Sequence, residues 1–376
     1  MDAQKINSML SREEGTKLDF KLKLNIETES GKKELAKDVC AIANSRGGRG
    51  HILFGIEDKT KKIIGINLDE FSEEQIQQVV STRIDPPVPI SVDTVNIDNH
   101  IIGVLTIYYT EQKPHQLRDN GAFYIRRGST TDIMRKEEIA SMLQDTGLIN
   151  YELLPLYKAC IDDLDHEKLL NFFHKSGLPL NINKSILLSM GIIAKEKDYN
   201  EYHPTCGGML LFGKNPQIFL PHAIIRIHNY TNELNPEHYI ASGTIIEMLN
   251  DACSYLRNNI DNKDYPFEIV EDFLGKSVIY RDYFEINSAI EVFINKNKIE
   301  ITNPGAAVKE TNRSLEKYVR RNMWLYLKVI ALDSTGQYFN KSINLSELTQ
   351  KFGKIKTFNI LSKNLYKVIL PLKIKQ

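Results

Sequence analysis

Cysteine and tryptophan are scarce in this chain of 376 residues, which has four cysteines and one tryptophan. Cys40, Cys160, Cys206 and Cys253 lie far apart and form no C-x-x-C pair, which argues against a zinc knuckle or a disulfide framework. No run approaches the roughly 18 apolar residues of a membrane span, and the N-terminal segment has no hydrophobic signal core. We therefore expect a soluble protein of the reducing cytoplasm with no membrane partner.

Net charge is also absent, because 48 basic side chains balance 48 acidic ones. This excludes a uniformly basic protein held to nucleic acid by bulk charge, although a local basic face remains open. Residues 1–150 carry 20 basic and 23 acidic side chains, residues 151–305 carry 14 and 21, and residues 306–376 carry 14 and 4. The C-terminal excess of +10 (14 − 4) is consistent with a contact to nucleic acid, to an acidic partner or to the acidic middle of the chain.

The length indicates two or three domains. Apolar residues make up 42% and charged residues 26% of the chain, which is ordinary for a globular protein. The patterns divide the chain into an α+β domain over residues 1–147, a helical connector over 148–200, a second α+β domain over 201–305 and a basic C-terminal segment over 306–376.

The first domain is predicted to be a mixed sheet with flanking helices. Helical periodicity or capping signals indicate three helices, over residues 31–45, 72–84 and 136–147. Short apolar runs indicate strands over residues 51–56, 63–66, 90–97, 100–109 and 122–128. The first two of these strands would form one hairpin, and Asp98-Asn99 would form the turn of another.

The second half of the chain shows the same mixture of patterns. Strands are expected over residues 210–213, 222–230, 291–295 and 298–305, and a long amphipathic helix over 245–260. A further helix is expected around Trp324, followed by lysine-rich strands. The histidines of this half, His203, His222, His228 and His238, form no close pair with ligand spacing on one element, so we expect core or surface histidines.

Three carboxylates near the N-terminus form the first candidate site. Glu14 and Asp19 are five residues apart, with Gly15 permitting a bend between them, and Asp58 follows the expected strand 51–56. Converging carboxylates bind Mg²⁺ or Mn²⁺ through oxygen, and such a metal activates water for phosphodiester hydrolysis. Lys21 would neutralise the charge developing on the phosphate. The same acids would equally serve the fold, as solvated side chains or as partners of Lys21.

Basic residues form a second candidate site for nucleic acid. On a strand, Arg126 and Arg127 would point to opposite faces, and one of them could join the Ser129 and Thr130 hydroxyls as a phosphate clamp. Thr131 or Asp132 could also cap the helix that follows. Further candidates are the two helix lysines, Lys32 and Lys33, although a solvated helix face would show the same pattern.

Four motifs in order over about 140 residues resemble the AlbA-type domain of the Schlafen family. They are E-x4-D-F-K at Glu14, A-I-A-N-S-R-G-G at Ala41, G-I-E-D at Gly55 and Y-I-R-R-G-S at Tyr124. In Schlafen nucleases, the two acids of the first motif and the aspartate of the third form a metal-binding triad that cleaves structured RNA. The resemblance therefore implies a triad of Glu14, Asp19 and Asp58, with Asp19 in place of the commoner glutamate.

The second half resembles the segment that follows this domain in bacterial RecG-like regulators, where a GHKL-type ATP-binding fold comes next. Arg281-Asp282-Tyr283 and Asn303-Pro304-Gly305 match that pattern, but Lys276 stands where the metal-binding asparagine is expected and Tyr280 where the histidine is. An ammonium group cannot coordinate Mg²⁺. The resemblance thus implies a degenerate ATPase-like domain that serves architecture or dimerisation, and ATP is not expected as a cofactor.

Hypotheses of different classes follow. The first is a Schlafen-like, metal-dependent endonuclease with RNA, tRNA included, as the favoured substrate and DNA as the other option; an antiviral, growth-arresting role would fit it. The second is a non-catalytic DNA-binding transcriptional regulator whose C-terminal half dimerises or senses a ligand. A third, a nucleotide-sensing regulator, is opposed by Lys276.

Overall fold

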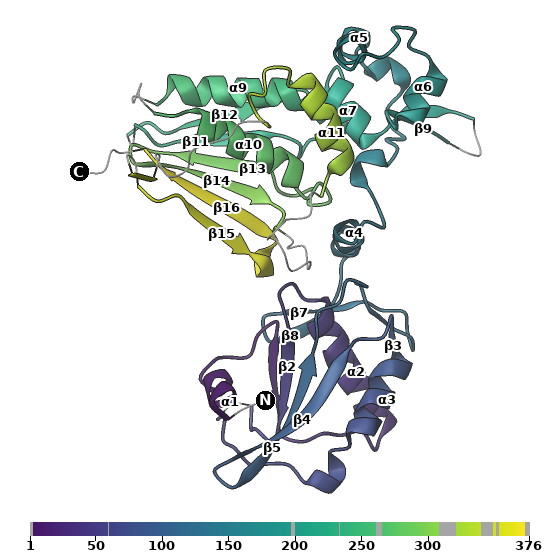
Figure 1. Ribbon diagram of the computed structural model, residues 1–376, viewed down its shortest axis with the longest axis vertical. Coiled ribbons are helices and arrows are strands. Elements are labelled where there is room, and N and C mark those ends of the chain that lie inside the picture. Colours follow the sequence, from purple (N-terminus) through teal and green to yellow (C-terminus); the bar gives the residue numbers. More distant parts are fainter. Residues whose placement is uncertain are drawn as a thin grey trace. The chain divides into compact units, whose positions relative to one another are not determined.

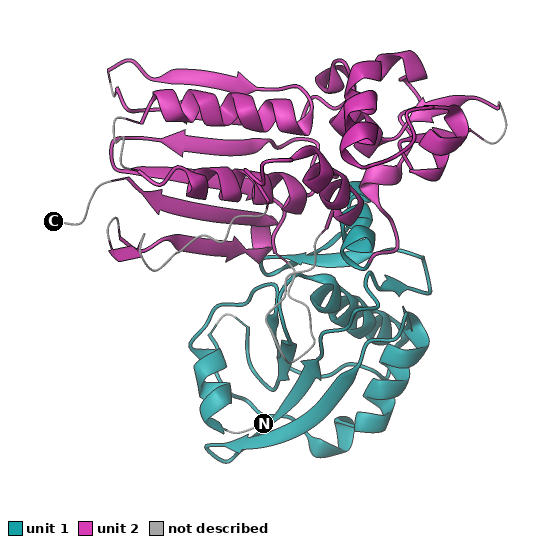
Figure 2. Ribbon diagram, turned by 45° about the horizontal axis from the view of Figure 1, so that its top comes forward, with its two compact units in different colours: residues 1–146 teal, residues 147–376 magenta. Residues whose placement is uncertain are grey.

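The computed structural model of the chain describes residues 3–58, 60–196, 200–232, 234–260, 265–307, 321–339, 349–350 and 353–372. Its contacts divide the chain into two compact units, residues 1–146 and 147–376 (Figure 2). Both units mix helices with sheets, which confirms the predicted α+β class. Among the described residues, no helix is long and apolar enough to cross a membrane.

Unit 1 is built on a four-stranded mixed sheet in the order β1-β2-β5-β4 (Figure 1). Strand β1 runs parallel to β2, and the other neighbours are antiparallel. The turn between β4 and β5 is the predicted one, because Asp98 and Asn99 both have positive φ, 49° and 63°, as a two-residue hairpin requires. The strands are β1 (Leu18–Lys21), β2 (Gly50–Phe54), β4 (Ile90–Ile97) and β5 (His100–Ile107).

Helices cover both faces of this sheet (Figure 1). Helices α2 (Glu29–Asn44) and α3 (Glu73–Arg83) pack on one face, where Ile52 and Leu105 belong to their core. Helix α1 (Ala3–Leu10) packs on the other, where Leu53 and Val104 belong to a second core. Successive strand residues therefore alternate between two apolar layers. This explains why β2 is a continuous run of buried residues rather than an alternating one.

Local signals place the helices of unit 1 close to their predicted bounds. Thr28 caps α2 by accepting from the Gly31 N–H, and Ser72 caps α3 by accepting from the Gln75 N–H. Helix α4 (Lys136–Asp145) follows its N-cap residue Arg135, whose N–H donates to the Glu138 carboxylate at 2.7 Å. The cap expected at Thr131 or Asp132 is therefore wrong, since both residues lie in a strand.

Two predicted strands of unit 1 differ from expectation. Residues 122–128 do not join the main sheet; instead β7 (Tyr124–Arg127) pairs with β8 (Thr130–Ile133) in a separate two-stranded sheet. Residues 63–66 form only an isolated bridge, Ile56 to Ile63, because Gly55 and Gly65 both adopt positive φ and their backbones pack closely. Short strands β3 (Ile84–Asp85) and β6 (Gln116–Leu117) form one more pair, and a 3₁₀ turn, η1, spans Leu68–Glu70.

Unit 2 contains a six-stranded sheet in the order β12-β11-β13-β14-β16-β15 (Figure 1). Only β11 and β13 are parallel neighbours. The described part of the basic C-terminal segment supplies β15 and β16, so it continues this sheet; residues 308–320, 340–348, 351–352 and 373–376 of that segment lie outside the described residues. The strands are β11 (Ile225–Asn229), β12 (Glu237–Ala241), β13 (Ile290–Ile294), β14 (Lys298–Pro304), β15 (Lys356–Ile360) and β16 (Leu365–Pro371).

Helices α9 (Ile245–Asn258), α10 (Glu268–Tyr280) and α11 (Met323–Leu332) belong to the single large core of unit 2. A mostly helical part precedes the sheet: η2 (Tyr151–Leu153), η3 (Ile161–Asp163), α5 (His166–Lys175), α6 (Lys184–Ser189), the hairpin β9 (Ile193–Lys195) and β10 (Tyr202–Pro204), α7 (Cys206–Phe212) and α8 (Pro216–Phe219). The strand predicted over 210–213 is wrong, because these residues end α7, which Thr205 caps. A short apolar run does not distinguish a strand from a buried helix. The last 3₁₀ turn, η4, spans Leu361–Lys363.

Asn44, fully buried at the end of α2, joins three segments of unit 1. Its Nδ2 donates to the carbonyls of His115 (2.8 Å) and Tyr124 (2.9 Å), and its Oδ1 accepts from the His115 N–H (2.8 Å). Asn44→Ala should lower the free energy of unfolding of unit 1 by about 3 kcal/mol, since it leaves three buried backbone groups without partners. Denaturant titration would measure this, and the exposed Asn7→Ala provides the control. Equal stability of the two variants would contradict it.

Candidate functional site

The first candidate acid, Asp19, is buried on β1. Its Oδ1 accepts a hydrogen bond from Nη2 of Arg126 at 2.8 Å, and the two side chains are only 6% and 3% exposed. Its Oδ2 lies 3.6 Å from Nζ of Lys21, which stands two residues along the same strand and on the same face. No described residue donates a hydrogen bond to this Oδ2, although the atom is buried. Asp19 therefore keeps one oxygen that is only partly compensated.

Glu14 folds back onto the same strand. The bend expected at Gly15 is present, because the Gly15 N–H donates to the Leu18 carbonyl at 3.0 Å. The Glu14 carboxylate then accepts from the Phe20 N–H at 2.7 Å. Burial raises the pKa of Glu14; the Phe20 N–H opposes this, while the neighbouring carboxylates of Asp19 and Asp58 add to it. Glu14 and Asp19 are thus a close pair of acids whose negative charges repel.

Asp58 is exposed in the turn after β2, close enough to Glu14 for its charge to be felt there. Among the described residues, however, Glu14, Asp19 and Asp58 do not form a group whose oxygens all lie within 4.8 Å of one another. The structure brings the three acids to one side of unit 1 without closing them into a tight triad. A buried Asp19 oxygen without a donor, next to a second carboxylate, nonetheless fits a hard cation bound through oxygen.

Lys21 is held by acids. Its Nζ lies 2.8 Å from Asp38, 3.4 Å from Glu34 and 3.6 Å from Asp19. Burial alone would lower the pKa of Lys21, but Asp38, Asp19 and Glu34 outweigh it and keep the pKa above its usual range. Lys21 is therefore a permanent cation beside Asp19, with about a third of its side chain exposed.

The basic candidates divide as the strand pattern predicts, with Arg126 buried and Arg127 exposed. The structure corrects the interpretation of Arg126 as a surface phosphate contact, because its guanidinium is buried against Asp19. Arg127 is more accessible but already bridges Glu138, through two hydrogen bonds of 2.8 Å, and Asp132. The helix lysines also have acidic neighbours: Lys32 lies 3.2 Å from Glu29, and Lys33, 60% exposed, lies 3.7 Å from Asp119.

Sequence patterns did not indicate a cluster of lysine amines at the C-terminal end of α2. Lys17 Nζ donates to the Ile42 carbonyl at 2.7 Å, and Lys113 Nζ donates to the Ser45 carbonyl at 3.2 Å. Burial and the neighbouring Lys113 lower the pKa of Lys17 to about 6, and burial also lowers the pKa of Lys113 to about 8. These amines satisfy carbonyls that the helix leaves free. The signal was present only as isolated lysines, 96 positions apart (113 − 17).

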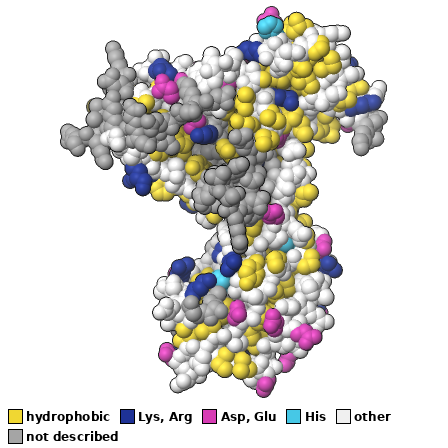
Figure 3. Space-filling model, in the orientation of Figure 1, with side chains coloured by type: hydrophobic (Ala, Val, Ile, Leu, Met, Phe, Trp, Pro, Cys, Tyr) yellow, Lys and Arg dark blue, Asp and Glu magenta, His cyan; other side chains and the backbone are white. Residues whose placement is uncertain are grey.

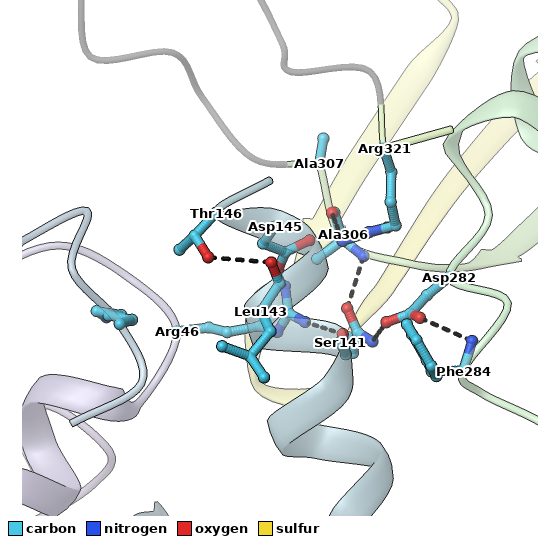
Figure 4. A network of polar contacts seen from close by, with 12 residues as sticks. Arg46, Ser141, Leu143, Asp145, Thr146, Asp282, Phe284, Ala306, Ala307 and Arg321 are labelled. Atoms are coloured by element: carbon cyan, nitrogen blue, oxygen red, sulfur yellow. Dashed lines mark hydrogen bonds and ion pairs between the residues drawn. The ribbon is translucent and has the colours of Figure 1, made fainter. Parts of the chain in front are cut away.

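Arg46, just beyond the same helix end, connects it to α4. Its Nη1 lies 2.9 Å from the Asp145 carboxylate and its Nη2 donates to the Ser141 hydroxyl at 3.0 Å (Figure 4). On the face of unit 1 seen in Figure 3, Lys and Arg side chains gather mainly in the upper part and acidic side chains in the lower part. On this face, basic and acidic side chains are thus partly separated.

In unit 2, the residues expected from the ATPase-like pattern have structural partners. Nη2 of Arg281 donates to the carbonyls of Glu285 (3.1 Å) and Ser288 (2.6 Å). Asp282 accepts from the Phe284 N–H at 3.1 Å (Figure 4). Lys276 lies 2.5 Å from Asp272 on α10. It also lines a cavity of about 230 Å³ between α10, β14 and β16. The other lining residues are Phe273, Ser277, Tyr280, Asn303, Gly305, Ala307, Tyr366 and Val368.

Residues 14–135 match the family model described as Schlafen, AlbA_2. The segment spans all four motifs that carry the resemblance, so the likeness to this family lies within unit 1. The match ends before unit 2, so the ATPase-like character expected of the second half stays a prediction. No curated protein matches the chain.

Two solved structures are similar to the chain at low identity. One is the DIP2311 protein of Corynebacterium diphtheriae, at 18% identity and a TM-score of 0.42, covering 98% of this chain and 68% of that one. The other is the N-terminal domain of a RecG-related protein of Nitrosomonas europaea, at 14% identity and a TM-score of 0.26, covering 33% of this chain and 84% of that one.

The buried pair of Arg126 and Asp19 leads to a first test at this site. Arg126→Met should lower the free energy of unfolding of unit 1 by about 3 kcal/mol or more, because Asp19 loses its main cation in a desolvated position. The matched control is Arg127→Met on the opposite face of β7, where an exposed ion pair is worth at most about 1 kcal/mol. Denaturant titration of both variants would measure the difference. Equal losses would show that burial of the pair is unimportant.

Lys17 makes stability depend on pH. Its folded pKa, about 6, lies below the ordinary lysine value of 10.5, so between these values the unfolded chain binds more protons. The free energy of unfolding of unit 1 should therefore rise as the pH increases from 7 to 9, and Lys17→Met should reduce this slope. Lys33→Met, which removes an exposed lysine, should leave the slope unchanged. A slope that Lys17→Met does not alter would contradict the assignment.

Proposed function

We propose that this chain is a nucleic-acid-binding protein whose unit 1 hydrolyses RNA phosphodiester bonds at Glu14, Asp19 and Asp58. The observation that carries the proposal is the buried Asp19 oxygen without a hydrogen-bond donor beside the Glu14 carboxylate, whose pKa is raised. Two adjacent acids of this kind favour binding of a divalent cation, since it relieves their repulsion. The preference for RNA over DNA rests on the likeness to the Schlafen family.

The side chains of this chain would hold Mg²⁺ or Mn²⁺ with Glu14, Asp19 and Asp58 as oxygen ligands. Such an ion supplies an activated water and polarises a phosphoryl oxygen. Arg126 is a positioning residue, because its bond to Oδ1 of Asp19 leaves Oδ2 directed elsewhere. Lys21, kept cationic by Asp38, stands beside this oxygen with part of its side chain exposed, where it would stabilise negative charge on a bound phosphate.

A second function, a DNA-binding regulator without chemistry, is favoured by a different observation. Asp19 and Arg127 already have oppositely charged partners within unit 1, and the three acids do not close to within 4.8 Å in the described residues. In this case the acids would stabilise the fold, and unit 2 would dimerise or bind a small ligand in the cavity beside Lys276.

Cleavage assays on labelled tRNA and on single- and double-stranded DNA, with Mn²⁺, Mg²⁺ or EDTA, distinguish these functions. We expect metal-dependent cleavage of RNA that falls about 100-fold or more in Asp58→Asn, since loss of a metal ligand removes several kcal/mol of transition-state stabilisation. Glu57→Gln is the matched control, because it removes an adjacent exposed carboxylate from the same turn. Binding without cleavage, unchanged in Asp58→Asn, would assign the protein to the regulator class.

A further inference from the structure

A cluster of two glutamates and one histidine lies on the β9–β10 hairpin of unit 2, apart from the site in unit 1. One ligand atom from each of Glu196, Glu201 and His203 lies within 4.8 Å of the other two. His203 Nε2 is 3.2 Å from Glu196 Oε2 and 3.8 Å from Glu201 Oε2. Among the described residues, no other group of three or more His, Cys, Asp and Glu side chains meets at this spacing.

The hairpin geometry explains why these side chains converge. The Glu196 N–H donates to the Glu201 carbonyl at 2.8 Å, so the two residues face each other across the end of the hairpin. His203, two residues beyond Glu201 on the same strand, pairs with Ala194, two residues before Glu196. Side chains two residues apart on a strand share a face, and directly opposite residues do too. All three therefore project from one face of the hairpin.

The tautomer of His203 places a lone pair, rather than an N–H, toward the two glutamates. The ring Nδ1 lies 2.9 Å from the Ala159 carbonyl, and a carbonyl can only accept, so Nδ1 carries the proton. The other nitrogen, Nε2, then presents a lone pair to two carboxylates. The His203 side chain is only 9% exposed, whereas the two carboxylates reach solvent. A cation bound between Nε2 and the glutamates would use this lone pair.

We propose that His203, Glu196 and Glu201 bind a divalent transition-metal ion, with Zn²⁺ as the preferred probe. Histidine ligands of zinc typically donate their other N–H to a backbone carbonyl, as His203 does to Ala159. Ligands about 2.0–2.1 Å from a tetrahedral zinc ion are separated from each other by about 3.3 Å, so the spacings from Nε2 need little adjustment. Glu201, 67% exposed, leaves the site open to solvent, and a water would complete the coordination.

The competing explanation is a metal-free ion pair between a doubly protonated His203 and the glutamates. The ion pair and the metal site differ in how the protein responds to added metal ions. A metal site needs all three donors and binds Zn²⁺ more tightly than Mn²⁺, because affinity follows the order of the divalent metals. An ion pair alone gives no saturable metal binding.

The experiment is a titration of the EDTA-stripped full chain with Zn²⁺ and with Mn²⁺, in competition with a chromogenic chelator and followed by thermal shift. We expect one equivalent of Zn²⁺ to bind at this site and to stabilise unit 2. His203→Gln should weaken this binding at least 10-fold, whereas His174→Gln, an exposed histidine of α5, should not. Glu201→Gln removes an exposed ligand without disturbing the core, so it tests the site even if His203→Gln fails to fold.

Absence of saturable Zn²⁺ binding, or binding that both Glu201→Gln and His203→Gln leave unchanged, would overturn the proposal in favour of the ion pair. The variant Asp58→Asn separates the two metal proposals. It should retain the Zn²⁺ equivalent in unit 2, whatever the outcome of the cleavage assay.

Discussion

The buried ion pair between Arg126 and Asp19 is the interaction on which the candidate site depends. It joins β7 to β1 across 107 positions of sequence and orients one carboxylate oxygen of Asp19, so the other is left without a hydrogen-bond donor, 3.6 Å from Nζ of Lys21. Two charges removed from water stabilise little by themselves, because desolvation offsets most of their attraction. The pair contributes instead to the specificity of the fold, because each buried charge needs the other as its partner and this fixes the position of β7 against β1. The same pair thus holds the small β7–β8 sheet in place and prepares the acidic site.

Around this pair, unit 1 concentrates polar groups at one end of α2. Asn44, Lys17, Lys113 and Arg46 all bond to carbonyls or side chains near that end. A helix end leaves carbonyls without partners, and a buried end must find donors for them. Here Lys17 and Lys113 donate to carbonyls at the helix end, while Asn44 and Arg46 donate from it to other segments. These bonds connect the segments before β1 and β6, strand β7 and helix α4 to one helix. The A-I-A-N-S-R-G-G motif, which begins at Ala41 and contains this helix end, therefore contributes to the assembly of the domain as well as to any ligand site.

The sequence predicted elements whose cause is local. The Asp98-Asn99 turn, the helix start at Ser72 and the alternation of Arg126 and Arg127 all follow from neighbouring residues. Prediction from the sequence failed for side chains whose partners are distant along the chain. The burial of Arg126 depends on Asp19, and the role of Lys17 depends on the carbonyl of Ile42. Prediction also failed at residues 210–213, where an apolar run fits a helix and a strand equally. His203 was set aside because its neighbours in the cluster are glutamates rather than histidines.

The order of strands in unit 2 has a consequence for synthesis of the chain. Strand β16 lies between β14 and β15, so β14 has no partner on that side until residues 365–371 have emerged from the ribosome. Until then, the N–H and C=O groups of β14 that pair with β16 are unpaired at a sheet edge. Unit 1 contains all of its own strands and has no such delay. The nascent chain therefore carries a folded first unit while the second awaits its closing strand, and this interval is when unit 2 is most exposed to aggregation.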